Sequence, residues 1–375
     1  MARPRTTGGA IAVRILETAL APIAAAALAV LVAGSILRLA GANPVAVLGD
    51  ALAYGLTPTT LVAVANKAIP YYVAGLAAAI GFHLRLFNIG IDGQYRLAAF
   101  AAAVVGAAVT LPAPLHLLLI AAVALAVGAG WALIAGWLLV RRGVNVVIST
   151  IMLNAVASGI VAYLLSPDRL AQQAAGSNNV TTATIAESGW VPAIATPAGG
   201  INGLIVLAAA LGVGYWIVLN RTTLGFEIRA TGLAARAAAV AGVRASRLAF
   251  LVMGASGAVA GLVGLPQLLG ASHRFGLDFP SGLAFTGLSV AILGRNHPVG
   301  MAIAAFTWAF LERSAQVLDF AGISREVVTI LQAVIVLSIV VAYEVVRRAR
   351  ARRDRRSVAE EIERVTGGPA DGAVT

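Results

Sequence analysis

The 375-residue chain contains no cysteine. Disulfide bonds, thiol nucleophiles and cysteine-ligated metals are therefore excluded, and redox chemistry is not expected. Charge is also scarce, because Asp, Glu, Lys and Arg make up only 11% of the residues and hydrophobic residues make up 59%. A typical soluble domain carries about 25% charged residues. This composition predicts a polytopic membrane protein.

Sequence motifs for catalysis are missing as well. The four histidines are scattered, and none belongs to an HExxH pair. No GxxxxGK[ST] phosphate loop occurs, so the chain is not expected to bind ATP in that way. Gly254-Ala-Ser-Gly257 superficially resembles a nucleophile elbow, but it lies in an apolar run where small residues favour close helix contact. A membrane enzyme is therefore a poorly supported class.

Long apolar runs dominate what is present. A helix needs about 20 mostly apolar residues to span a bilayer, and about ten such segments are predicted. They are Thr18–Leu39, Thr60–Phe82, Leu97–Leu111, Leu115–Val140, Val144–Leu165, Ile201–Leu219, Leu248–Leu269, Gly282–Leu293, Val299–Leu311 and Val327–Val346. The third, eighth and ninth are short, so we expect them to be tilted, partly unwound or re-entrant. The expected fold is an all-α transmembrane bundle.

The arginines are distributed unevenly between these segments. Cytoplasmic loops carry an excess of positive charge, so the arginine-rich segments are predicted to lie inside. These hold Arg3, Arg5, Arg14, Arg85, Arg96, Arg141, Arg142, Arg221, Arg229, Arg236, Arg244, Arg247, Arg295 and the arginines from Arg347 to Arg364. The segments predicted outside hold Arg38, Arg169, Arg274, Arg313 and Arg325. Both termini are thus expected in the cytoplasm, and membrane orientation explains the net charge of +11 better than nucleic-acid binding does.

Three parts of the chain follow from this topology. Residues 1–17 form a cytoplasmic N-terminal segment, residues 18–346 the transmembrane domain, and residues 347–375 a basic cytoplasmic tail. The first apolar run exceeds the 7–15 residues of a signal peptide, which favours an uncleaved span. The basic start of the tail is typical of a cluster near anionic lipid.

Polar residues inside the apolar runs are the candidate functional residues, because they are costly in lipid. Phe87–Gln94 reads FNIGIDGQ and places Asn88, Asp92 and Gln94 at the cytoplasmic approach to the third span. Its glycines permit a sharply turning backbone. A structural turn and an element of a solute path are equally compatible with this pattern.

A second polar group lies in the fifth span. Gly143–Asn154 reads GVNVVISTIMLN, and the spacing places Asn145, Ser149 and Asn154 on roughly one helix face. Such a face contacts either protein or a water-filled path. Lys67, the only lysine, lies in the second span, where snorkelling toward the outer interface is favoured over contact with a solute.

The connector Arg229–Val243, RATGLAARAAAVAGV, lies between two long apolar runs. Its small residues and scattered arginines are typical of a compact amphipathic helix. We therefore predict a docking surface for a cytosolic partner within a coupling segment at residues 220–247.

Four motifs resemble the permease subunits of ABC importers for nucleosides. They are FNIGIDGQ at Phe87–Gln94, GVNVVISTIMLN at Gly143–Asn154, RATGLAARAAAVAGV at Arg229–Val243 and GLSVAILGRNHPVG at Gly287–Gly300. The resemblance runs from about Leu61 to Tyr343. The larger group also contains permeases for simple sugars and branched-chain amino acids, and the second and fourth motifs resemble the nucleoside branch more narrowly.

The resemblance implies a type II importer permease in the cell membrane that moves nucleosides by alternating access. ATP and Mg would be bound by a cytosolic ABC ATPase partner, so no cofactor is expected in this chain. A second, different permease subunit and an extracytoplasmic solute-binding lipoprotein are the other implied partners. Nucleic acid is not among them.

The resemblance also assigns roles to residues. The segment Arg229–Val243 is similar to the family's coupling helix, with Gly232, Ala237, Ala238 and Gly242 at its small positions. Glu227, Arg229 and Arg236 would pair with the ATPase across the rim. This chain has Ala234-Ala235 where relatives usually have Asn-Pro, and Ala239 at a common arginine position. The implied solute path contains Asn88, Asp92, Gln94, Asn145, Ser149 and Asn154.

Other functions fit part of the pattern. A sugar or branched-chain amino-acid permease is the first alternative within the family. A secondary transporter is the second, but few acids lie inside the apolar runs to couple an ion gradient.

Overall fold

The computed structural model describes residues 27, 30–32, 34–39, 41–173, 179–316, 330, 333–334, 337–338 and 341. The chain divides into two compact units, residues 1–52 with 315–375, and residues 53–314. Several predicted segments lie wholly or mostly outside the described residues. These are residues 1–17, the first span Thr18–Leu39, the tenth span Val327–Val346 and the tail 347–375.

The first unit contains a small apolar cluster of Leu37, Val47 and Ala315. Helix α2 (Pro44–Gly55) lies mostly in the part of the sequence that belongs to this unit. It begins with a proline, a residue suited to the first turn of a helix because its nitrogen has no hydrogen to leave unpaired. No helix was predicted here, because its 12 residues are fewer than a membrane span needs.

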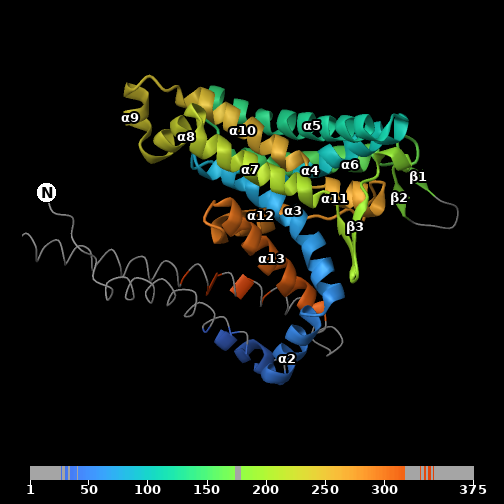
Figure 1. Ribbon diagram of the computed structural model, residues 1–375. Coiled ribbons are helices and arrows are strands. Elements are labelled where there is room, and N and C mark those ends of the chain that lie inside the picture. The colour runs from blue at the N-terminus through green and yellow to red at the C-terminus, as the bar shows by residue number, and fades with distance from the viewer. Residues whose placement is uncertain are drawn as a thin grey trace, which may run out of the picture. The chain divides into compact units, whose positions relative to one another are not determined.

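The second unit is a bundle of helices (Figure 1). The helices are α3 (Pro58–Phe82), α4 (Ile91–Ala108), α5 (Ala113–Arg142), α6 (Val146–Leu164), α7 (Ile205–Arg221), α8 (Thr223–Leu233), α9 (Ala235–Val240), α10 (Ala245–Gly261), α11 (Leu265–Gln267), α12 (Leu283–Leu293) and α13 (Pro298–Ser314). A π-helical turn, Leu268–Ser272, continues α11, and a 3-10 turn spans Glu187–Gly189. Two antiparallel hairpins pair β1 (Gln172–Gln173) with β2 (Val180–Thr181), and β3 (Ala193–Thr196) with β4 (Gly199–Asn202).

Four helices of the described chain are long and apolar enough to cross a membrane, or up to six if each bent helix pair is one span. The four are Pro58–Phe82, Ala113–Arg142, Val146–Leu164 and Ala245–Ser272. Each matches a predicted span to within about three residues at either end, because apolar length is the strongest signal in the sequence. The predicted total of ten spans stays a prediction.

Small residues hold α10 against α5. A Cβ atom on Gly257 would lie 2.4 Å from the carbonyl oxygen of Gly128, and one on Gly261 would lie 2.0 Å from that of Ala124. Close backbone approach through small residues is a common means of helix association in membranes. The prediction that Gly254-Ala-Ser-Gly257 permits close helix contact is confirmed.

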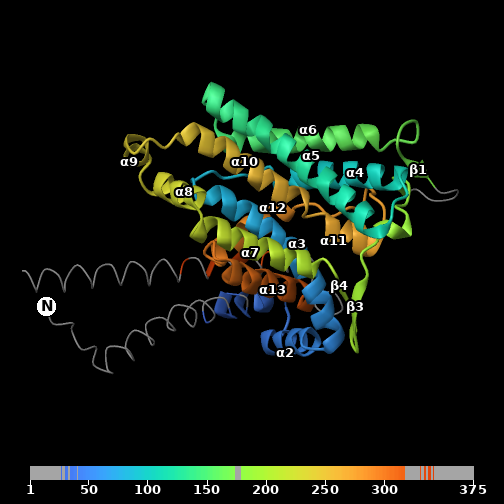
Figure 2. The same cartoon turned by 45° about the horizontal axis from the view of Figure 1, so that its top comes forward.

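The second unit has two distinct ends (Figures 1 and 2). We call one the elbow end, because α8 and α9 lie there beside the turns that follow α3, α5 and α12. We call the other the hairpin end, because it carries β1 to β4. The elbow end holds Arg85, Arg141, Arg142, Arg221, Arg229, Arg236, Arg244, Arg247 and Arg295.

Candidate functional site

The predicted coupling helix is two helices joined at a bend. Helix α8 begins after Thr222, whose hydroxyl accepts a hydrogen bond from the Gly225 backbone N–H at 3.1 Å. It ends at Leu233, and Ala234 has an extended φ of −148° before α9 begins at Ala235. The two helices together form what we call the elbow. The compact helix that was expected within Arg229–Val243 is therefore interrupted at Ala234.

The apolar side chains at the tip of the elbow are exposed. Leu233 is 81% exposed and Val240 is 92% exposed. Arg236 and Ala237 are also exposed. Exposed apolar side chains rimmed by polar ones are typical of a protein interaction surface.

Two of the predicted docking residues instead pack against the protein itself. A Cβ atom on Gly232 would lie 1.9 Å from the carbonyl oxygen of His83, so α8 rests on the turn after α3. Ala238 is only 6% exposed, and its carbonyl accepts the Val243 backbone N–H at 3.0 Å. Their small size is needed within this chain. Gly242, with φ of +86°, has no neighbour near its Cβ position and turns the chain after α9.

The remaining predicted coupling residues, Glu227 and Arg229, lie in α8, the first helix of the elbow. Arg229 donates a hydrogen bond from its guanidinium to the Leu219 carbonyl, which closes the corner between α7 and α8. Glu227 lines a hollow of about 380 Å³ that also contains Arg244 and Arg247. This hollow thus holds charge of both signs beside α8.

His83 connects the elbow to α7 and to the turn between α12 and α13. Its Nε2 lies 2.9 Å from the Tyr215 hydroxyl in α7, and that hydroxyl donates to the Asn296 carbonyl at 2.7 Å. Asn296 belongs to the turn between α12 and α13. Burial and the Arg229 guanidinium both lower the pKa of His83, which follows the last residue of α3. Sequence reasoning missed this contact because its members are far apart in the chain.

Asn88 and Gln94 form a closed hydrogen-bonded group inside the bundle. Each amide donates to the other's oxygen at 3.0 Å, and both side chains are at most 1% exposed. Asn88 also donates to the Ser256 hydroxyl at 2.9 Å, and Ser256 donates to the Ala77 carbonyl at 2.7 Å. The group joins α3, α10 and the start of α4. These amides are occupied by protein partners.

Asn154 fastens α6 to the start of α4. Its side-chain oxygen accepts the Gly93 backbone N–H at 2.8 Å, and its amide donates to the Ile89 carbonyl at 2.9 Å. Asn145 caps α6 by accepting the Val147 N–H at 2.8 Å, and Ser149 donates to the Asn145 carbonyl at 3.0 Å. The predicted common face is thus used for capping and helix contact, and a role for these residues in the solute path stays a prediction.

Asp92 joins the starts of two helices. Its carboxylate accepts the Ala284 backbone N–H at 3.2 Å, in the first turn of α12. A carboxylate at a helix N-terminus is stabilised by the unpaired N–H groups there. Helix α4 begins at Ile91, six positions before the predicted span at Leu97, so Asp92 and Gln94 lie within its first turn rather than before it.

Lys67 has a partner inside the bundle. Its Nζ lies 2.5 Å from the Glu312 carboxylate of α13, and the Tyr71 hydroxyl donates to the other carboxylate oxygen. The side chains of Lys67 and Glu312 are 30% and 34% exposed. Snorkelling alone was therefore an incomplete interpretation of Lys67. Glu312 was missed because the predicted ninth span stopped at Leu311, whereas α13 continues to Ser314.

An aromatic group orders the hairpin end. The Trp190 ring stacks on His273 with ring centroids 3.9 Å apart, and the Ile185 N–H donates to the His273 carbonyl at 2.9 Å. The Phe275 N–H donates to the Thr182 hydroxyl at 3.0 Å. These contacts hold the segment that leads from the π-helical turn to α12.

Comparison with known proteins gives the family. Residues 60–340 match the family model described as branched-chain amino acid transport system / permease component. The chain belongs to this permease family. The match covers the helical unit described above, which makes the chain an integral membrane protein.

Three relatives illustrate the range of solutes within the family. A guanosine ABC transporter permease of Bacillus subtilis is 34% identical over 74% of this chain and 79% of its own length. A nucleoside ABC transporter permease of Lactococcus lactis subsp. cremoris is 30% identical over 83% and 87%. A glucose ABC transporter permease of Haloferax volcanii is 32% identical over 76% of both chains. No solved structure matches the chain significantly.

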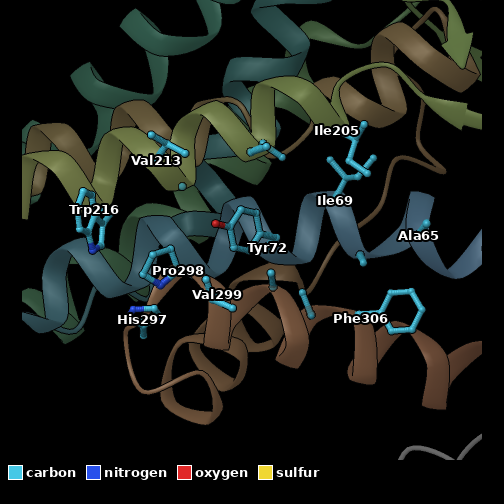
Figure 3. A pocket seen from close by; sticks show the side chains of 16 residues that line it. Ala65, Ile69, Tyr72, Ile205, Val213, Trp216, His297, Pro298, Val299 and Phe306 are labelled. Carbon is cyan, nitrogen blue, oxygen red and sulfur yellow. The ribbon is translucent and has the colours of Figure 1, made fainter.

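The permease also contains a large apolar cavity between α3, α7 and α13 (Figure 3). Its volume is about 580 Å³. The labelled lining residues are Ala65, Ile69, Tyr72, Ile205, Val213, Trp216, His297, Pro298, Val299 and Phe306. Few of these side chains can form hydrogen bonds with a polar solute. The charged groups in the described part of the permease lie elsewhere.

Proposed function

We propose that this permease forms the translocation path for nucleosides in an ABC importer and that a cytosolic ATPase drives it through the elbow. Two of the three relatives above are named as guanosine or nucleoside permeases, and this observation supports nucleosides as the solute class. The glucose permease supports a simple sugar as the second candidate. A secondary transporter or a membrane enzyme has no such support.

The assignment of the elbow as the ATPase contact rests on its exposed tip. Leu233 and Val240 are apolar and exposed at the arginine-rich end of the bundle. Positive charge favours the cytoplasmic side, so the elbow end would face the ATPase. Displacement of the elbow would be transmitted through the contact of Gly232 with His83, and then through Tyr215 to the turn at Asn296.

The importer would work by alternating access. ATP binding would close two ATPase subunits, move the elbows and open the path between two permease subunits to the other side. A second, different permease and an external solute-binding lipoprotein complete the proposed complex. No bond in the solute is made or broken.

Uptake by the complete complex tests the solute class. The permease, expressed together with its proposed ATPase, second permease and binding lipoprotein, is expected to import labelled guanosine in cells that lack their own nucleoside transporters. Labelled glucose is the matched comparison. Import of glucose without import of any nucleoside would replace the proposed solute class with simple sugars.

A charge at the elbow tip tests the ATPase contact. Val240→Asp is expected to leave membrane insertion intact, because this side chain contacts little of its own chain, but to remove ATPase co-purification. Val206→Asn, on an exposed position of α7, is the control. Ala238→Trp is a poorer test, because this buried side chain would disturb α9 itself. A Val240→Asp complex that assembles and transports normally would show that the ATPase docks elsewhere.

A further inference from the structure

Arg96 lies deep inside the bundle. Gly90 lies against Thr150, and Gly93 against Asn154 and Ala157, so α4 and α6 run in the same direction. Asn154 is nine positions beyond the α6 cap Asn145, which places Gly93 about 13 Å from the cap at 1.5 Å per residue.

The same geometry gives the depth of Arg96. Arg96 is three positions beyond Gly93 along α4, and therefore about 18 Å from the α5–α6 turn. Arg141 and Arg142 end α5 just before that turn, and their positive charge places the turn at the membrane surface in the predicted topology. Arg96 was predicted to lie in a cytoplasmic loop, and the structure corrects this placement because α4 begins within the bundle.

Within the described chain, the guanidinium of Arg96 forms neither a hydrogen bond nor an ion pair. Its Nε is buried and unpaired, while the residue as a whole is partly exposed. Asp92, one helical turn earlier, attracts it electrostatically but is bonded to Ala284.

Other helices cover much of α4 around Arg96. Helix α4 packs against α5, α6, α10 and α12, and the neighbouring Ala98, Ala99 and Phe100 are buried. Tyr95 donates to the Pro280 carbonyl at 2.6 Å, which holds the start of α12 beside this part of α4. A charged side chain inside a membrane bundle usually faces a water-filled cavity or a solute pathway.

We infer that Arg96 lines the solute path and recognises a solute with two adjacent hydrogen-bond acceptors, as a 6-oxopurine nucleoside presents through O6 and N7. The inference rests on the proposed function and narrows its solute class. A guanidinium has paired N–H donors that match O6 and N7 of guanine, whereas adenine offers N7 beside a donating amino group. Arg96 would thus favour guanosine and inosine over adenosine.

The ratio of guanosine to adenosine uptake by the complete complex tests this inference. Because the binding lipoprotein stays the same, a change in the ratio between wild type and variant belongs to the permease. Arg96→Lys keeps the charge but loses the paired donors, and the ratio is expected to fall roughly tenfold. Arg142→Gln, which removes an exposed arginine at the end of α5, should leave it unchanged.

Accessibility provides a second measurement. In this cysteine-free chain, Arg96→Cys is expected to react with a hydrophilic methanethiosulfonate, and guanosine should slow the reaction. Ala98→Cys, at a position with 0% exposure, and Val156→Cys, on the exposed apolar face of α6, should remain unmodified. An unreactive Arg96→Cys in an assembled complex would overturn the inference.

The two proposals fail in different ways. A wild-type complex that imports no nucleoside overturns the proposed function and this inference together. Nucleoside import with the same guanosine to adenosine ratio in wild type and Arg96→Lys overturns only the assignment of Arg96.

Discussion

A single amide, that of Asn154, completes the hydrogen bonding of a helix start that lies inside the protein. Its oxygen accepts the Gly93 N–H and its nitrogen donates to the Ile89 carbonyl. Water would normally satisfy such groups at a helix end, but inside a bundle a side chain has to do so. Asn154 is therefore expected to contribute to stability whether or not a solute touches it.

Substitution of Asn154 measures this contribution to stability. Asn154→Leu leaves two buried backbone groups unpaired, at about 1–3 kcal/mol each, and should clearly lower the melting temperature of the purified permease. Asn154→Asp keeps the acceptor for Gly93 but loses the donor to Ile89 and places a carboxylate against that carbonyl, so it should lower the melting temperature as well. Thermal unfolding in detergent measures both, with Met152→Gln on the exposed face of α6 as the control. Equal stability of the Leu variant and wild type would contradict the structural role.

His83 should make stability depend on pH. Because its pKa is lowered in the folded protein, the unfolded chain takes up the proton first as pH falls. The stabilisation is present above the ordinary value of about 6.5 and is lost as pH falls below it toward the lowered pKa. Melting temperature measured from about pH 8 to about pH 5 should therefore fall.

The variant His83→Gln isolates this contribution. Glutamine keeps a donor for the Tyr215 hydroxyl but does not titrate, so the fall with decreasing pH should be smaller than in wild type. Burial also lowers the pKa of His273, which leaves a residual dependence in the variant. An identical pH profile for variant and wild type would show that His83 does not contribute.

At the scale of the element, the elbow depends on one glycine. A side chain on Gly232 meets the backbone carbonyl of His83, which cannot move away without displacing the end of α3. Gly232→Val should therefore lift α8 from α3 and uncouple ATP hydrolysis from uptake. Gly214→Ala, in α7 with nothing within 4 Å of its Cβ position, is the control. ATPase activity and uptake, measured on the same vesicles, give the coupling ratio.

The helices show where sequence reasoning succeeds. The predicted span Thr60–Phe82 corresponds to α3 (Pro58–Phe82), because a long apolar run leaves few alternatives in a membrane. Helix α4 was predicted to start late because Asp92 and Arg96 interrupt the apolar pattern. Their polar groups are accommodated by contacts with distant segments, such as that of Asp92 with Ala284, which no local pattern reveals.

In the candidate site, too, the sequence reveals the polar residues but not their partners. The positions of Asn88, Gln94 and Asn154 as buried polar residues could be read from the sequence. Their partners could not, because Ser256 and Gly93 are reached only through tertiary packing. The bend at Ala234 was also not predicted, because this chain has no proline at Ala234 or Ala235 to end the helix.

At the scale of the whole molecule, the arginine distribution predicts orientation. The elbow end, with its many arginines, should face the cytoplasm, and the hairpin end should face outward. Ala234→Cys at the elbow and Ile194→Cys on the exposed β3 strand are then expected to react with an impermeant maleimide from opposite sides of the membrane. Ser177, in the same predicted outer segment, lies outside the described residues. Reaction of both cysteines from one side would refute the topology.

The Lys67–Glu312 ion pair has a consequence for synthesis of the chain. Its two residues are 245 positions apart, so at about 5–20 residues per second roughly 12 to 50 s pass between their translation. During that interval α3 carries an ammonium group whose carboxylate does not yet exist. The nascent helix can lower this cost by extending the lysine toward the headgroups. We therefore expect snorkelling of Lys67 to be confined to membrane insertion, before Glu312 of α13 is available to pair with it.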